Sequence, residues 1–147
     1  MINSRKLSDL DPAVRKICEA HVRECKHRGI EIIVTSTWRD FESQTALYAI
    51  GRTVQKDRRS VTKARAGKSW HNFRAAWDVV GIVSGKPIWD AGDPVWREII
   101  KIGKTVGALA GADWPTFPDL PHFYCIPDKI TLAVALRRWQ DNGTIFV

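Results

Sequence analysis

The sequence predicts an α+β fold in which helices flank a small antiparallel sheet. Helix and strand patterns follow one another in the order helix, strand, helix, long loop, two strands, helix, two strands and helix. The chain has 147 residues, of which 44% are apolar, and this suits one globular domain with one core. No internal repeat and no Pro/Ser-rich linker interrupts the chain, so we expect a single domain over residues 1–147.

The first helix has a clear start and a clear stop. It should begin near Asp11-Pro12, because proline suits the first helical turn, and it should end at Gly29. Its apolar stripe consists of Val14, Ile17, Cys18, Val22 and Cys25. The next segment, residues 30–36 (IEIIVTS), is rich in β-branched residues and predicts a strand.

A short helix and a long loop come next. Asp40 can cap the helix, which should stop at Gly51. Residues 52–68 then form a long loop, and such loops in compact domains are usually functional or mobile. Residues 75–83 predict a strand, and the Ser84-Gly85 turn leads to a short partner strand around residues 87–89.

The C-terminal third should contain two helices and two strands. Asp93-Pro94 opens a helix that ends near Gly107. Strands are expected over residues 109–114 and 122–126. A final helix, with Leu132, Ala135, Leu136 and Trp139 directed inward, should end at Gly143.

The chain is strongly basic, with a net charge of +7 and a pI near 9.6. Residues 52–68 contain seven Lys or Arg against one Asp, so this segment alone carries +6. Such a charge favours an anionic partner, which could be nucleic acid, a membrane surface or an anionic cell wall, although a solvated mobile loop also fits. The segment contains no aromatic residue, which weakens the interpretation as a reader of single-stranded nucleic acid.

Cysteine content and hydropathy argue against several classes of protein. The three cysteines, Cys18, Cys25 and Cys125, are an odd number without CxxC spacing, so a disulfide framework or a thiolate zinc site is not expected. No apolar stretch is long enough to span a membrane, and no apolar segment follows the charged N-terminus as in a secretory signal. We therefore expect a protein that is made and folded in the cytoplasm.

Two of the four histidines lie next to carboxylates. His21 and His27 fall on the first helix and are expected to be structural. His71 precedes Asp78 by seven residues, and His122 follows Asp119 by three.

These two clusters are compatible with a metal site. Asp78 falls inside an otherwise apolar strand, where a carboxylate is costly unless it is paired or binds a metal. Two imidazoles and one carboxylate can hold zinc with an open fourth position, and a further carboxylate can accept a proton during metal-assisted hydrolysis. From spacing alone, a buried salt-bridged aspartate is the more usual explanation, and no HExxH pattern is present.

Residues 69–78 (SWHNFRAAWD) and residues 119–122 (DLPH) contain the two clusters within longer motifs. The first resembles the SxHxxGxAxD motif and the second the (D/E)xxH motif of the LAS metallopeptidases, a group of D-Ala-D-Ala carboxypeptidases and dipeptidases and of L-alanyl-D-glutamate endopeptidases. The flanks, residues 36–53, 61–68 and 111–123, are similar to family motifs as well. The resemblance runs from about Thr35 to Phe123, with the spacing intact.

The resemblance implies a LAS (hedgehog-like) fold and a role for each matched residue. It implies zinc (Zn2+) held by His71, Asp78 and His122, with Asp119 as general base and Arg39 stabilising the oxyanion. Ser69 and Gln44 also match family positions and are candidate substrate contacts, although helix packing fits Gln44 nearly as well.

One position departs from the family pattern. The glycine that usually follows HNF is Arg74 here, and an arginine would be strained if that position required a positive φ.

We therefore expect a monomeric zinc peptidase, similar to a phage endolysin, that cuts the peptidoglycan stem peptide between L-Ala and D-Glu. The basic segment would hold it on the anionic wall or envelope, and no separate wall-binding domain is expected. It would wait in the host cytoplasm until the membrane is permeabilised. A D-alanyl-D-alanine carboxypeptidase, a nucleic-acid-binding module and a zinc-binding fold without catalysis are the alternatives.

Overall fold

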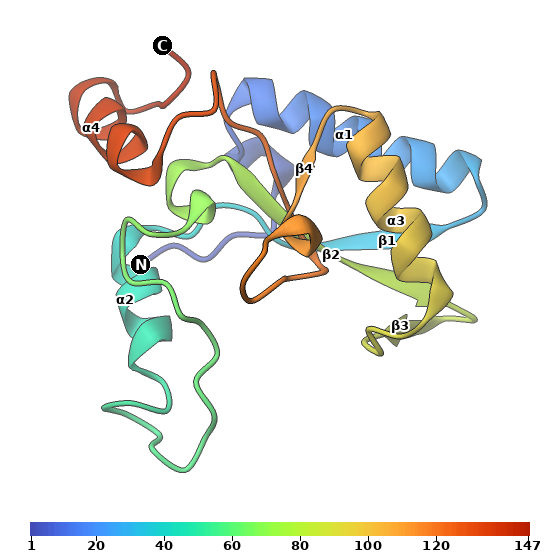
Figure 1. Ribbon diagram of the computed structural model, residues 1–147, viewed down its shortest axis with the longest axis horizontal. Coiled ribbons are helices and arrows are strands. Elements are labelled where there is room, and N and C mark those ends of the chain that lie inside the picture. The colour runs from blue at the N-terminus through green and yellow to red at the C-terminus, as the bar shows by residue number, and fades with distance from the viewer.

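A five-stranded antiparallel sheet runs through the middle of the protein, with four α-helices around it (Figure 1). The computed structural model describes residues 1–147. The predicted α+β class is confirmed. The helices are α1 (Pro12–His27), α2 (Phe41–Ala49), α3 (Pro94–Thr105) and α4 (Leu132–Asn142), with short 3-10 helices η1 (Leu7–Asp9), η2 (Trp70–Phe73) and η3 (Gly111–Asp113). The strands are β1 (Glu31–Ser36), β2 (Ala76–Val83), β3 (Lys86–Ile88), β4 (Leu109–Ala110) and β5 (His122–Tyr124).

Strand β2 is the centre of the sheet. The strand order is β1-β2-β5-β4, and β3 also pairs with β2. Asp78 of β2 lies opposite Ser36 on one side and opposite His122 on the other. The register therefore places two of the expected ligands directly across from each other.

Helices α1 and α3 cover one face of the sheet (Figure 1). Trp77 and Val79 are fully buried on this face, where Trp77 contacts His21 of α1 and Phe123 of β5. Because successive side chains of a strand point to opposite faces, Asp78 between them is directed to the other face. The apolar core thus lies on one side of β2, and the polar site on the other.

The helix starts are confirmed and follow local chemistry. The side chains of Asp11, Asp40 and Asp93 accept hydrogen bonds from the backbone N–H groups of their first turns. Proline occupies the first turn of α1 and of α3. None of the helices combines the length and the hydropathy that a membrane span requires.

The expected strand over residues 109–114 is wrong beyond its second residue. Strand β4 ends at Ala110, and the chain turns into η3. A Cβ at Gly111 would lie 2.7 Å from the carbonyl oxygen of Asp119, whose N–H donates to Gly111 O at 3.0 Å. The chain leaves the ladder here because the backbone of residue 119 passes against Gly111.

His21 is a core residue, as its position on the first helix suggested. It is fully buried, its Nε2 donates to Ile99 O at 3.0 Å, and its Nδ1 accepts from Trp77 Nε1 at 3.2 Å. Only the neutral ring satisfies both contacts. Burial lowers the pKa of His21 below its usual 6.5, although the bond to Ile99 opposes this shift.

We expect this burial to make stability depend on pH. Below about pH 6.5 the unfolded chain binds a proton at His21 that the folded chain excludes, so stability falls by about 1.4 kcal/mol per pH unit over that window. His21→Gln cannot titrate and should show a shallower dependence. Urea unfolding of chelator-treated proteins at about pH 7.5 and about pH 5 measures both slopes, and equal slopes would contradict the assignment.

Candidate metal centre and cavity

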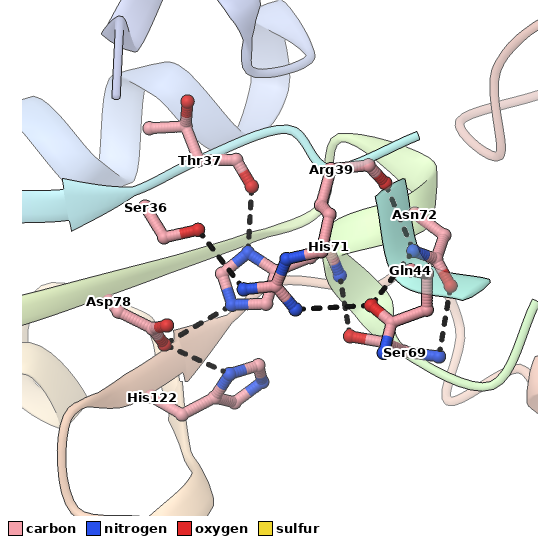
Figure 2. A network of polar contacts seen from close by, with 9 residues as sticks. All are labelled: Ser36, Thr37, Arg39, Gln44, Ser69, His71, Asn72, Asp78 and His122. Atoms are coloured by element: carbon pink, nitrogen blue, oxygen red, sulfur yellow. Dashed lines mark hydrogen bonds and ion pairs between the residues drawn. The ribbon is translucent and has the colours of Figure 1, made fainter. Parts of the chain in front are cut away.

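His71, Asp78 and His122 converge on the face of the sheet opposite α1 and α3 (Figure 2). One potential ligand atom from each residue lies within 4.8 Å of those of the other two. His71 Nε2 and His122 Nδ1 both lie 3.2 Å from Asp78 Oδ1. Both histidines are almost completely buried: His71 is 2% exposed and His122 is 4% exposed.

Each ligand is placed by a different element. Asp78 and His122 are cross-strand partners of β2 and β5, whose side chains on one face lie about 5 Å apart. His71 lies on η2, which Ser69 caps by accepting from the N–H of His71 at 3.3 Å. Its ring is oriented by Thr37, as Nδ1 donates to the carbonyl of Thr37 at 2.7 Å.

This orientation fits a bound cation. Because Nδ1 of His71 carries the proton that Thr37 accepts, Nε2 of the neutral ring presents a lone pair to Asp78. A lone pair and a carboxylate at 3.2 Å repel unless a proton or a metal ion lies between them. Two imidazole nitrogens and one carboxylate form a donor set that zinc commonly takes.

Electrostatics also favour a cation here. Burial alone would raise the pKa of Asp78, but attraction and hydrogen bonds from His71 and His122 outweigh it and hold the pKa well below its usual range. Burial lowers the pKa of His122, so that ring tends to stay neutral and able to coordinate.

Asp119 lies in the wall of the same cavity, beside the cluster but outside it. Asp119 is an exposed residue of this wall. The pKa of Asp119 is raised, first because the cavity walls partly exclude water and second because Asp78 repels the charged form. An aspartate with a raised pKa near the metal ligands is suited to accept and return a proton.

Arg39 faces the cavity from the segment after β1 and is held by a polar network (Figure 2). Its guanidinium donates to Gln44 Oε1 at 3.0 Å and to Ser36 Oγ at 3.3 Å. Its Nε is buried without a hydrogen-bond partner. Burial lowers the pKa of Arg39 while Asp78 and Asp119 favour its charge, and a guanidinium remains protonated.

Gln44 is a positioning residue in this structure. It is fully buried, and its amide is occupied by Arg39, by Asn72 Nδ2 at 3.3 Å and by Ala64 O at 2.7 Å. It does not line the cavity, whereas Ser69 does. Of the two expected substrate contacts, only Ser69 has access to a ligand.

Arg74 adopts the strained conformation that its replacement of glycine suggested. Its φ is +59°, in the left-handed region, which costs a residue with a Cβ about 1–2 kcal/mol. The side chain gains contacts in return. Nε donates to Asp9 O at 2.6 Å, and the guanidinium lies 5.0 Å from the Trp38 ring. Arginine at this position therefore ties η1 to the end of η2.

The cluster opens into a cavity of about 760 Å³. Arg39 and Asp119 line it together with the three clustered residues. Part of the basic segment lines it as well, because residues 60–64 and Lys68 lie in its wall. Lys56, Arg58 and Arg59 do not reach the cavity and are exposed.

Three residues of this site were missed by sequence reasoning. Thr37 orients His71, Asn72 links Arg39 to Gln44, and Gly111 gives room to the backbone of Asp119. Asn72 and Gly111 fall inside the motifs that carry the family resemblance, so they could have been noted. Thr37 acts through its carbonyl, and residue type gives no signal for that role.

Two family models match the chain, both described as D-alanyl-D-alanine carboxypeptidase. The VanY model matches residues 7–89, and a second model of the same description matches residues 62–125. The peptidoglycan L-alanyl-D-glutamate endopeptidase CwlK of Bacillus subtilis is 37% identical over 129 residues, covering 82% of this chain and 76% of CwlK.

Solved structures with the same fold include two peptidases. The L-Ala D-Glu endopeptidase ChiX of Serratia marcescens superposes with a TM-score of 0.60 at 20% identity, covering 80% of this chain and 81% of ChiX. A vancomycin-resistance D,D-pentapeptidase VanY, in complex with Zn(II), superposes with a TM-score of 0.59 at 17% identity. The match covers 92% of this chain and 80% of the VanY chain.

Proposed function

Because the chain belongs to the LAS-type family of D-alanyl-D-alanine carboxypeptidases and L-alanyl-D-glutamate endopeptidases, we propose that it is a zinc endopeptidase that hydrolyses the L-alanyl-D-glutamate bond of peptidoglycan. The observation that carries this proposal is the convergence of the His71, Asp78 and His122 cluster with Asp119 and Arg39 in one cavity. The 37% identity to CwlK supports the choice of bond.

Each residue has a defined task in this mechanism. His71, Asp78 and His122 would hold zinc, which when bound polarises the scissile carbonyl and makes water more acidic. Asp119 accepts a proton from the attacking water and passes it to the leaving amine. Arg39 donates to the oxygen on which negative charge develops, and Gln44 and Ser36 fix the guanidinium beforehand. Ser69 contacts the bound peptide.

Digestion of purified sacculi, followed by mass spectrometry of the released fragments, tests this function. An endopeptidase of this specificity should leave glycan strands that keep only the L-alanine of each cleaved stem peptide, and it should release peptides with D-glutamate at the new N-terminus. The matching family descriptions also favour a D-alanyl-D-alanine carboxypeptidase. Release of single D-alanine without strand separation would identify that activity and overturn the endopeptidase.

The basic segment, residues 52–68, is proposed to hold the enzyme on the anionic wall, chiefly through Lys56, Arg58 and Arg59, which are exposed and lie outside the cavity. Reversing Lys56, Arg58 and Arg59 to Glu should weaken binding to sacculi, most of all at low salt where screening is least.

Cleavage of a short soluble stem peptide should barely change in this triple variant. Co-sedimentation with sacculi and peptide turnover are measured on the same preparation. Equal losses in both assays would show that these residues act in the active site and would contradict wall binding.

A further inference from the structure

Four basic side chains line the cavity, and two of them are already engaged. Arg39 is held by Gln44 and Ser36. Arg52 donates to the carbonyls of Tyr48 at 2.6 Å and Thr62 at 3.0 Å, and it lies 3.8 Å from the Tyr48 ring centroid. Through these two bonds Arg52 links α2 to Thr62, the residue before Lys63. The two remaining cations of the cavity are Lys63 and Lys68.

Lys63 is held in place by an aromatic ring. Its Nζ lies 4.0 Å from the ring centroid of Phe117, which comes from the segment between η3 and β5. The contact joins two parts of the cavity wall that are distant in sequence. A ring orients an ammonium without neutralising it, so Lys63 presents an uncompensated charge to the cavity.

Phe117 occupies this position at a conformational cost. Its φ is +51°, although it is bulky and precedes Pro118, and both features disfavour that region. The residue is 67% exposed, so core packing does not explain the conformation. Strained backbone of this kind persists at ligand-binding sites when it directs a side chain, and here it directs the ring under Lys63.

The place of Lys63 relative to the reaction follows from the chain. Phe117 is two residues from Asp119, which bounds their Cα separation to about 7 Å. The ammonium of Lys63 therefore contacts the wall segment that carries Asp119, and this is the side of the cavity on which Asp119 protonates the leaving amine in the proposed mechanism. A glutamate on that side has two carboxyl groups and continues the peptide through only one of them, so the other remains a free carboxylate.

We propose that Lys63, positioned by Phe117, is a specificity-determining residue that binds the free carboxylate of the acidic residue on the amine side of the scissile bond. The inference rests on the proposed function and adds a subsite to it. An ammonium with three free donors forms charge-assisted hydrogen bonds with a carboxylate, and a neutral carboxamide cannot match them.

Two synthetic stem peptides test the proposal, identical except that the free glutamate carboxyl is a carboxylate in one and a carboxamide in the other. We expect the native chain, loaded with zinc, to prefer the carboxylate peptide by about tenfold in kcat/KM. In K63Q this ratio should fall close to 1, mainly through KM for the carboxylate peptide. F117A should lower the ratio as well, whereas F117Y, which keeps the ring, should preserve most of it.

K101Q is the matched control, because it removes the same charge at an exposed position on α3, outside the cavity. Its ratio should equal that of the native chain. An equal fall in K101Q and K63Q would indicate diffuse attraction and overturn the subsite, and a fall in K68Q in place of K63Q would overturn the choice of lysine. A native chain that cleaves both peptides equally well overturns the subsite and leaves the endopeptidase standing, whereas cleavage of neither peptide overturns both.

Discussion

Replacing His71 by alanine is expected to abolish peptide hydrolysis and metal retention together. His71 supplies one of three clustered ligand atoms, and its loss leaves one imidazole and one carboxylate. Even residues that only hydrogen-bond a ligand are worth about 10–100-fold in metal affinity, so removal of a ligand should cost more. Elemental analysis after dialysis should find about one zinc per native chain and a small fraction of that in the variant.

The control for this variant is His27→Ala. His27 lies at the end of α1, outside the cavity, and its side chain is 70% exposed. It should retain zinc and turnover. His122→Ala should behave like His71→Ala, because both rings contact Asp78. Stoichiometric zinc together with full activity in His71→Ala would place the metal site elsewhere in the chain.

The helices and most of the strands could be predicted because their signals are local. Asp11, Asp40 and Asp93 cap the helices they precede, and the caps depend only on residues two or three positions ahead. Strand β4 could not be predicted correctly. It ends where Asp119, eight residues after Gly111, packs against the chain, and a local pattern does not contain that contact.

The functional site also combines features that local sequence predicts with features that depend on tertiary contacts. Spacing drew attention to His71 and Asp78 but could not show that His122 is the cross-strand partner of Asp78, because register is a tertiary property. The family resemblance supplied that connection. It also made Gln44 a candidate substrate contact, whereas its burial and its bonds to Arg39 and Asn72 follow from the packing of α2 beside η2.

The basic segment shows what charge counting can miss. From the sequence, residues 52–68 are one basic segment with one expected function. In the structure, some of its basic side chains line the cavity and others lie outside it. Lys63 and Lys68 line the cavity, while Lys56, Arg58 and Arg59 do not. The contact of Lys63 with Phe117 depends on a positive φ at a residue before proline, and propensity argues against that conformation.

Asp119→Asn should separate an enzyme from a fold that only binds zinc. Asp119 is outside the ligand cluster, and in the proposed mechanism it accepts a proton from the attacking water. A positioned general base contributes about 10²–10⁴-fold, so turnover should fall by at least two orders of magnitude. The amide keeps the size of the carboxylate and removes its basicity.

Folding should survive this substitution, because the backbone of Asp119 makes its structural bonds. Its N–H donates to Gly111 O at 3.0 Å, and its carbonyl accepts from the N–H of His122 at 3.3 Å. Both bonds remain in the variant. Burial and repulsion by Asp78 outweigh the attraction from His122, His71 and Arg39 and raise the pKa of Asp119, so the charge that the amide removes is held at a net cost. Zinc content and melting temperature should therefore stay close to those of the native chain.

Two further variants complete the Asp119 experiment. Asp78→Asn should lose zinc and activity together, because a neutral amide is a poorer ligand than a carboxylate. Asp113→Asn, in η3, breaks only an exposed ion pair with Lys104 and should change neither. If Asp119 were a turn residue without a chemical task, its asparagine variant would melt earlier and keep full turnover per folded molecule. Melting temperature, zinc content and rate measured on one preparation decide between these outcomes, and a destabilised but fully active Asp119→Asn would remove Asp119 from the mechanism.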